Sequence, residues 1–260
     1  AIYQDPTEGW KMSDTASLIL TSSGTSTFNR DGNNTTVLVE KATNINVTVK
    51  NGTYNMKGLV GPRGDNAVLK LVGIDNNKAK LTLVIDDATL NLEAKPTDVG
   101  DKTYVSAIRL IGTDESTMTL NNGAVVNITA AYDNEDIGVY GINLNTEKCV
   151  ITVDGGSTLN INASNKDGKS YAIYSKNANT ITLKKGALKM TAGTSVFLNN
   201  KYVVEGATVD FKATSVDVTV GAVVTPPATS DVSVVAFASV AVLALVAGAL
   251  VIVRKKREIA

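Results

Sequence analysis

Histidine is absent from this 260-residue chain, and several other groups that carry chemistry in proteins are scarce. The absence of histidine excludes every mechanism that needs an imidazole base and most catalytic zinc sites. The single cysteine, Cys149, can form neither an internal disulfide nor a thiolate metal cluster. The 25 basic residues balance the 25 acidic residues, so the chain lacks the basic excess that is typical of a nucleic-acid-binding protein.

Aromatic residues are also few, at 5% of the chain, so a large aromatic core is not expected. The chain is instead rich in Thr, Asn, Val and Gly. These residues favour strands and tight turns over helices, because β-branched side chains fit a pleated sheet and Asn and Gly accept turn conformations. The composition therefore predicts an all-β protein.

The C-terminal segment is a long hydrophobic run. Residues 232–253 carry no charge, and a helix of this length rises about 33 Å, which is enough to cross a hydrocarbon core of about 30 Å. The alternative is a buried core helix, but such helices rarely run this far without a polar interruption. Basic residues open the tail 254–260 and stay on the cytoplasmic side, so the preceding chain is predicted to lie outside the cell. The chain begins with Ala1 rather than Met, as expected after removal of a secretory signal.

A proline-containing motif precedes this span, in a predicted linker at residues 216–231. The motif consists of Pro226, Pro227, Ala228, Thr229 and Ser230. With the apolar span and basic tail that follow, it resembles the cell-wall sorting signal of Gram-positive surface proteins, which reads Leu-Pro-x-Thr-Gly; here Pro226 replaces Leu and Ser230 replaces Gly. The resemblance implies that a sortase cleaves after Thr229 and joins the chain to the cell wall. The alternative is a linker ahead of a permanent membrane anchor.

Residues 36–215 repeat, and each unit carries three short apolar stretches in a fixed order. The first stretch has two apolar residues at alternate positions, the second reads apolar, Thr, apolar, and the third reads apolar, polar, apolar. The first-stretch pairs are Leu69 with Leu71, Ile108 with Leu110, Ile142 with Leu144, and Val196 with Leu198. The central Thr residues, at intervals of 34, 37, 33 and 30, are Thr48, Thr82, Thr119, Thr152 and Thr182. The central polar residues of the third stretch are Asn55, Asn91, Asn127, Asn160, Lys189 and Asp210.

Repeats of this size indicate a solenoid, a propeller or an array. Three short strands per unit fit one coil of a single-stranded parallel β-helix. The same residue type recurs at the equivalent position of each repeat. This favours a parallel β-helix, in which equivalent positions lie side by side, over an antiparallel sandwich, in which unlike positions face each other. The pattern resembles the right-handed parallel β-helices of polysaccharide lyases and surface adhesins. Residues 1–35 are predicted to form an N-terminal cap and the first strand. Two columns of stacked side chains, hydrogen-bonded along the axis, are predicted at Thr48, Thr82, Thr119 and Thr152, and at Asn55, Asn91, Asn127 and Asn160.

Candidate ligand-binding residues lie in the first stretch and in the loops that lead into it. The outward positions of the first stretch are predicted to be Lys70, Arg109, Asn143, Tyr174 and Phe197. Lys70 and Arg109 are then neighbours in the stack, and two like charges so close are unfavourable unless an anion binds. Tyr can stack on sugar rings or anchor a protein partner; the alternative is that the rings cover the corners of the coil. The full set of candidates is Lys70, Arg109, Tyr104, Tyr140, Tyr171 and Tyr174.

Acidic residues suggest two further sites. Asp133, Glu135 and Asp136 are candidate ligands for Ca²⁺ in a loop, although three acids in four residues also arise by chance. Asp86 and Asp87 form a pair of the kind that hydrolases use, but their surroundings favour a turn. No other metal or cofactor is expected.

Three functions are compatible with these features. The favoured one is a non-catalytic protein of the cell surface that displays a β-helix for adhesion or glycan binding. Its expected partners are a membrane, a sortase and cell wall by resemblance, and a glycan or a host or neighbouring surface protein. The second is an extracellular polysaccharide lyase or hydrolase, in which a basic residue such as Lys70 or Arg109 removes the proton next to a uronate. The third is an architectural protein of the envelope that assembles with itself.

Overall fold

The computed structural model of the protein describes residues 15–30, 35–58, 67–73, 79–96, 104–112, 114–154, 156–184, 187–205 and 208–213. All of them belong to the first of the two units into which the chain divides, residues 1–225 and 226–260. Within these described ranges the chain forms 18 β-strands and no α-helix. The all-β prediction is therefore confirmed for this part of the protein.

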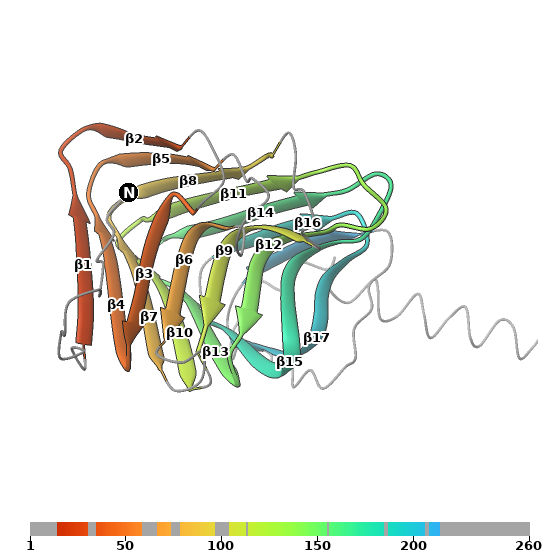
Figure 1. Cartoon of the computed structure of the whole chain (residues 1–260). Helices are drawn as coiled ribbons and strands as arrows, with labels where there is room; N and C mark the ends of the chain where they lie inside the picture. The colour runs from red at the N-terminus through yellow and green to blue at the C-terminus, as the bar shows by residue number, and fades with distance from the viewer. Residues whose placement is uncertain are drawn as a thin grey trace, which may run out of the picture. The chain divides into compact units, whose positions relative to one another are not determined.

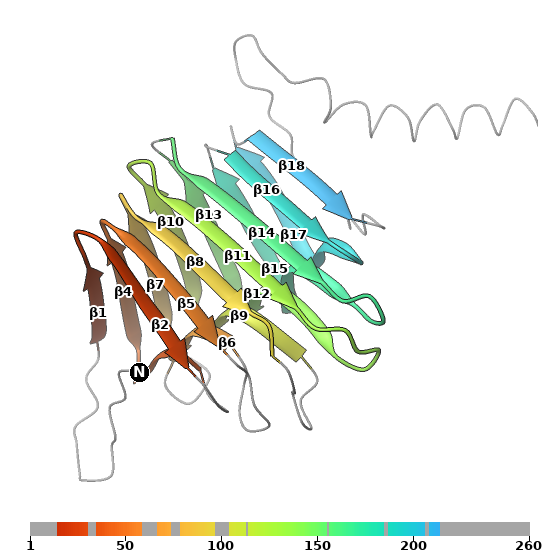
Figure 2. The same cartoon turned by 90° about the horizontal axis from the view of Figure 1, so that it is seen from above.

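The paired strands are all parallel, and they wind into a solenoid with three faces, named here A, B and C (Figures 1 and 2). Face A contains β1 (Thr15–Thr21), β4 (Asn44–Lys50), β7 (Lys80–Asp86), β10 (Glu115–Asn121), β13 (Lys148–Val153) and the second halves of β15 (Ser170–Lys184) and β17 (Ser195–Glu205). Face B contains β2 (Thr25–Arg30), β5 (Thr53–Gly58), β8 (Thr89–Ala94), β11 (Val125–Ala131), β14 (Thr158–Ser164), β16 (Ala187–Ala192) and β18 (Thr208–Ala213). Face C contains β3 (Val37–Ala42), β6 (Ala67–Gly73), β9 (Tyr104–Ile111), β12 (Gly138–Asn145) and the first halves of β15 and β17 (Ser195–Glu205).

These faces correspond to the three apolar stretches of the repeat. The first stretch forms face C, the second forms face A and the third forms face B. The prediction of a parallel β-solenoid with three short strands per coil is thereby confirmed. Its handedness stays a prediction.

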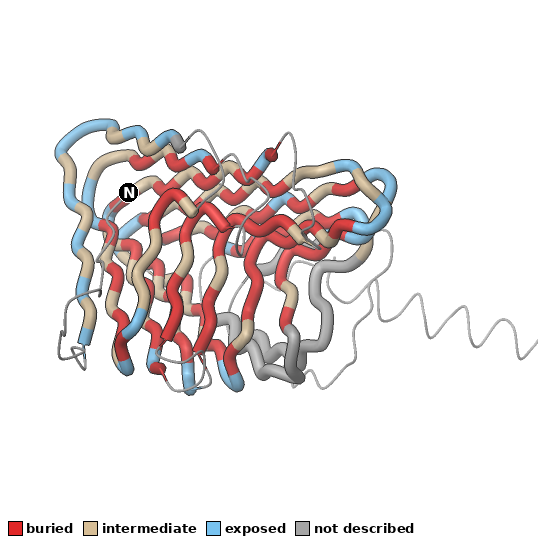
Figure 3. The backbone as a smooth tube through the Cα atoms, viewed as in Figure 1, coloured by how far each residue is buried: buried red, intermediate tan, exposed pale blue. Residues whose placement is uncertain are grey.

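Alternation with period two places the core inside the coil. In β4 the side chains of Ile45, Val47 and Val49 are buried, while the intervening Asn46 and Thr48 are half-buried and face outward. Buried and less buried residues alternate in the same way in successive coils (Figure 3). The buried apolar residues of all three faces form one continuous core. The core is held by hydrophobic burial, and the polar residues between its members keep the outer surface solvated.

The corner between faces A and B repeats with the coils. Asn51, Asp87 and Asn122 all adopt the left-handed conformation, with φ of 53°, 49° and 55°. This conformation turns the chain sharply between two strands, and Asn and Asp tolerate it better than most residues. Asp87 is therefore a turn residue, as the sequence indicated. Gly52 (φ 60°) is needed for space as well, because a Cβ there would lie 2.5 Å from the Gly24 carbonyl oxygen.

The predicted asparagine column is present on the outer surface of face B. Asn55, Asn91, Asn127 and Asn160 occupy equivalent positions in four successive strands. Each amide nitrogen donates to the side-chain oxygen of the preceding Asn: Asn91 to Asn55, Asn127 to Asn91, and Asn160 to Asn127, each at 2.8 Å. We call these four residues the asparagine ladder.

The predicted threonine column is only partly correct. Thr119 does pair with Thr152 on a parallel neighbour, but Val84 lies opposite both Thr48 and Thr119. Thr82 instead lies opposite Asn46 and Thr117, two residues away from the predicted register. A shift of two residues leaves the same side chains facing outward, so the alternation in the sequence cannot distinguish the two registers.

The last unit of face C differs from the prediction by one residue. Phe197 pairs with Ile173, and Leu198 pairs with Tyr174. The predicted register of this unit, which placed Phe197 in the same column as Tyr174, is therefore wrong by one residue. The long strand β15 shifts register between Tyr174 and Asn179, where it passes from face C to face A. No short sequence motif predicts this irregularity.

Several predicted segments lie outside the described residues. They are residues 1–14 of the N-terminal cap, the whole linker 216–231 with its sorting-like motif, the predicted span 232–253 and the tail 254–260. Among the helices and strands that the structure describes, no helix is long and apolar enough to cross a membrane.

Candidate functional site

The outer surface of face C gathers the six candidate ligand-binding residues. Parallel register places Lys70 opposite Arg109, Arg109 opposite Asn143, and Asn143 opposite Tyr174. Tyr104 begins β9, and Tyr140 lies opposite Tyr171 on the neighbouring strands β12 and β15. Residues that are up to 104 positions apart in the sequence thus meet on one surface, which we call the tyrosine face.

Aromatic stacking organises the tyrosine face. The rings of Tyr140 and Tyr174 stack with centroids 4.1 Å apart and an angle of 9° between their planes. Tyr104 stacks against Tyr140 at 5.9 Å, and Tyr171 lies tilted at 6.0 Å from it. The Arg109 guanidinium carbon lies over the Tyr104 ring, 5.0 Å from its centroid. These distances fall in the range of favourable aromatic and cation–π contacts, so the rings and the guanidinium form one row across adjacent coils.

The tyrosines of the row are buried to different degrees. Tyr140 and Tyr171 are 9% and 6% exposed, whereas Tyr104, Arg109 and Tyr174 are half-buried. Burial raises the pKa of Tyr140 well above its usual value of 10.0, and the neighbouring Tyr174 and Tyr171 raise it further. The Tyr140 hydroxyl therefore stays neutral and can act as a hydrogen-bond donor.

Two positions in β12 need glycine for space, and one of them, Gly138, makes room for the central ring. A Cβ on Gly138 would overlap the hydroxyl end of Tyr140, and a Cβ on Gly141 would overlap the Ile161 side chain and the Ala172 carbonyl. Both positions need glycine for space. The sequence Gly138 to Gly141 (GVYG) carried this signal, but the need for glycine becomes clear only when the neighbouring strand is in place.

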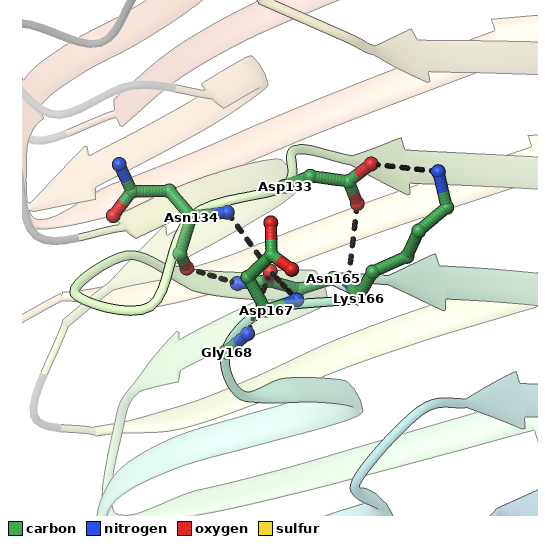
Figure 4. Close-up of polar contacts among 6 residues, drawn as sticks. All are labelled: Asp133, Asn134, Asn165, Lys166, Asp167 and Gly168. Carbon is green, nitrogen blue, oxygen red and sulfur yellow. Dashed lines mark hydrogen bonds and ion pairs between the residues drawn. The ribbon is translucent and has the colours of Figure 1, made fainter.

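Two loops that border the tyrosine face are joined by Asn165, a residue that sequence analysis missed (Figure 4). Its side chain is 6% exposed; the amide nitrogen donates to the carbonyl oxygens of Asn134 (2.8 Å) and Ile137 (2.6 Å). Its side-chain oxygen accepts from the backbone N–H groups of Asn134 (3.0 Å) and Gly168 (2.9 Å). One amide therefore ties the loop after β11 to the loop after β14. The only sequence signal was an Asn at a similar place in both loops, 31 residues apart.

The acidic loop does not support the predicted Ca²⁺ site. The Asp133 carboxylate accepts from the backbone N–H of Lys166 at 3.0 Å and forms an ion pair with its ammonium group at 3.0 Å (Figure 4). These hydrogen bonds lower the pKa of Asp133, the backbone contact contributing most. Glu135 and Asp136 are exposed, and nowhere in the described ranges do three acidic or cysteine side chains converge as metal ligands.

Comparisons with known proteins returned nothing similar: no protein-family model, no curated protein and no solved structure matches this chain. The functional argument therefore rests on the tyrosine face itself. Its partly exposed residues are Lys70, Tyr104, Arg109 and Tyr174, although the Nε and Nη1 atoms of Arg109 are themselves buried. Aromatic rings can contact the apolar face of a sugar, and charged donors can bind its oxygens.

Proposed function

We propose that the protein is a non-catalytic surface protein that binds glycans through the tyrosine face. The observation that carries this proposal is the row of Arg109, Tyr104, Tyr140 and Tyr174 across three neighbouring strands. Such a row is rigid before any ligand arrives, because each ring is held by its neighbours. A preformed surface loses little conformational entropy on binding, which favours affinity for a flexible chain such as a polysaccharide.

The column next to the row favours glycans that carry carboxylate or sulfate groups. Lys70 and Arg109 are paired positions on adjacent parallel strands, and both side chains are half-buried on the outer surface. A bound anion between them offsets the repulsion of the two like charges. Arg109 adds a second positive charge to this column, although its Nε and Nη1 atoms are buried in the fold.

A glycan array probed with the full-length chain in mild detergent tests the proposal. Binding to one or more acidic glycans is expected, and Arg109→Ala and Tyr174→Ala are each expected to weaken it about tenfold or more. Asn162→Ala is the matched control, because Asn162 is exposed on face B. Failure of the wild-type chain to bind any glycan, or equal loss in the control, contradicts the proposal.

A polysaccharide lyase is the second candidate, favoured by the adjacency of Lys70 and Arg109 alone. In that reaction a basic side chain removes the proton next to a uronate carboxylate and the glycosidic oxygen leaves, which produces an unsaturated sugar. Incubation of the full-length chain with a panel of uronate polymers and Ca²⁺ distinguishes the two candidates. New ultraviolet absorbance from the unsaturated product, absent with Arg109→Ala, would show that the protein is a lyase and not a non-catalytic glycan-binding protein.

The proposal also places the protein on the outside of the cell, and the support for this location comes from the sequence. The apolar residues 232–253, the basic tail and the motif Pro226 to Ser230 support a surface protein that is anchored in the membrane or joined to the wall by a sortase. Mass spectrometry of the native C-terminus separates the two anchors. A peptide that ends at Thr229 with a wall fragment attached indicates sortase processing, whereas an intact residue 232–253 segment indicates a permanent membrane anchor.

A further inference from the structure

Every polar group of the buried Asn165 amide is used in hydrogen bonds. Its oxygen accepts from the backbone N–H groups of Asn134 (3.0 Å), Asp167 (3.2 Å) and Gly168 (2.9 Å) (Figure 4). Its nitrogen donates to the carbonyl oxygens of Asn134 (2.8 Å) and Ile137 (2.6 Å). Because the nitrogen faces two acceptors and the oxygen faces three donors, the orientation of this side chain is fixed.

The two loops that this amide joins lead into neighbouring strands of the tyrosine face. The loop after β11 enters β12, and the loop after β14 enters β15. A Cβ on Gly168 would overlap the Asn134 carbonyl oxygen, so the two loops lie in close contact around the amide. The Asn165 side chain therefore fixes the path on which the chain enters β12.

The entry into β12 supports the central ring of the tyrosine face. Ile137 is the last residue of its loop, and the following Gly138 begins β12 opposite Tyr104 of β9. The hydroxyl end of the Tyr140 ring lies directly against Gly138, because a Cβ at that position would overlap it. A displacement of the Ile137 carbonyl moves the peptide group that joins it to Gly138, and with it the surface on which the Tyr140 ring rests.

Tyr140 is the ring through which such a displacement reaches the rest of the face. Its centroid lies 4.1 Å from that of Tyr174, 5.9 Å from that of Tyr104 and 6.0 Å from that of Tyr171. Tyr140 is 9% exposed, so it is packed closely and cannot shift without moving its neighbours. Tyr104 in turn carries the Arg109 guanidinium over its ring.

We propose that Asn165 is a positioning residue for the tyrosine face: its amide nitrogen holds the Ile137 carbonyl, and thereby the Gly138 backbone, where the four rings can stack. The inference rests on the glycan-binding function proposed above, since a shift of the rings then changes glycan affinity. Asn165 acts through the backbone and not by contact with the glycan. An aspartate has the same shape but lacks the N–H donors, and a serine is too short to reach the Ile137 carbonyl.

Near-ultraviolet circular dichroism of the full-length chain in mild detergent reports the arrangement of the rings without a glycan. Asn165→Ser keeps a hydroxyl that can accept from the N–H groups of its own loop but removes the donor to Ile137, so the tyrosine signal is expected to fall. Asn134→Ser is the matched control, because the Asn134 side chain accepts from the Asp136 N–H within one loop (2.9 Å). Thermal melting checks folding. A wild-type signal in folded Asn165→Ser, or an equal loss in Asn134→Ser, overturns the proposal.

Asn165→Asp adds a pH profile that a general loosening of the loops would not produce. Its carboxylate repels the carbonyl oxygens of Asn134 and Ile137, whereas the protonated acid can donate to one of them. Burial disfavours the charged form, so the tyrosine signal is expected to recover partly as the pH falls from about 8 to about 5. The wild type is the control, since it shares the charged groups of the two loops, which are Asp133, Glu135, Asp136, Lys166, Asp167 and Lys169. A signal that does not respond to pH beyond the wild type overturns the role of the amide nitrogen.

Affinity for polygalacturonate and heparin, which supply carboxylate and sulfate groups, is measured on the same variants. Asn165→Ser is expected to weaken binding about tenfold, and Asn134→Ser to change it less than about twofold. If the wild type binds no glycan but the spectra change as expected, the proposed function fails and the positioning of the rings by Asn165 stands. If the wild type binds and folded Asn165→Ser binds equally well, the proposed function stands and this inference fails.

Discussion

The asparagine ladder allows the stacking of coils to be tested bond by bond. Asn55 and Asn160 are its two ends, and each makes one ladder hydrogen bond, whereas Asn91 and Asn127 each make two. Replacing any of them by Ala removes its ladder bonds and changes little else, because the side chains lie on the half-buried outer surface. Pairs of replacements then report whether two residues share a bond.

The expected magnitudes follow from counting bonds. A typical intramolecular hydrogen bond contributes about 1 kcal/mol net. Asn91→Ala and Asn127→Ala each remove two bonds and are expected to cost about 2 kcal/mol, but together they remove three bonds, at about 3 kcal/mol. The pair is therefore less than additive by about 1 kcal/mol. Asn55→Ala and Asn160→Ala share no bond, so their costs of about 1 kcal/mol each are expected to add.

Urea unfolding of the wild type, the four single variants and the two double variants provides the measurement. Solenoids can unfold in segments, so circular dichroism and Tyr fluorescence must give coincident transitions before free energies are compared. The Asn55 and Asn160 pair is the matched control, since it carries the same substitutions without a shared bond. Additive costs for Asn91 and Asn127, or a coupling of equal size in the control pair, would refute the reasoning that the ladder is a chain of direct amide contacts.

Three further predictions follow from burial and space. Ile142→Asp is expected to lower the free energy of unfolding by about 3 kcal/mol or more, because it buries an unpaired charge. Asn162→Asp, on the exposed surface of face B, is expected to change it by less than about 0.5 kcal/mol. Equal costs would contradict the assignment of Ile142 to the core and Asn162 to the surface. Gly138→Ala is expected to displace the Tyr140 ring and reduce both the near-ultraviolet circular dichroism and glycan binding, whereas Gly24→Ala, which has open space around it, is expected to change neither. Burial, and then the nearby Glu115, raise the pKa of Cys149 from 9.0 to about 12, so ionisation favours the unfolded state as the pH rises above 9. The free energy of unfolding is expected to fall between pH 9 and 12 in the wild type, and less so in Cys149→Ala; equal slopes would argue against a buried thiol.

The asparagine ladder could be predicted because its residues are both equally spaced and of one type. The threonine column could not, because two registers that differ by two residues bury the same side chains. Asn165 was missed for a related reason. Nothing in its own loop distinguishes it from an ordinary turn residue, and its role arises from carbonyl groups in a loop about 30 residues earlier.

The candidate ligand-binding residues were found by type and by outward position, but their arrangement was not. Sequence analysis placed Tyr104, Tyr140 and Tyr171 in loops and Tyr174 in a strand, without a contact between them. In the folded chain they stack on one another, because strands β9, β12 and β15 lie side by side and Gly138 leaves room for the Tyr140 ring.

Alternation of apolar and polar residues, repeated about every 33 positions, by itself determined which side chains face the core and that coils stack in parallel. Both follow from local geometry, since a strand alternates every residue and similar coils bury most apolar surface when they stack in register. Only the tertiary structure decided which of two equivalent registers each strand takes and which tyrosines meet. These depend on loop lengths and corner turns between coils, and a pattern with period two is unchanged when a loop or turn shifts the register by two residues.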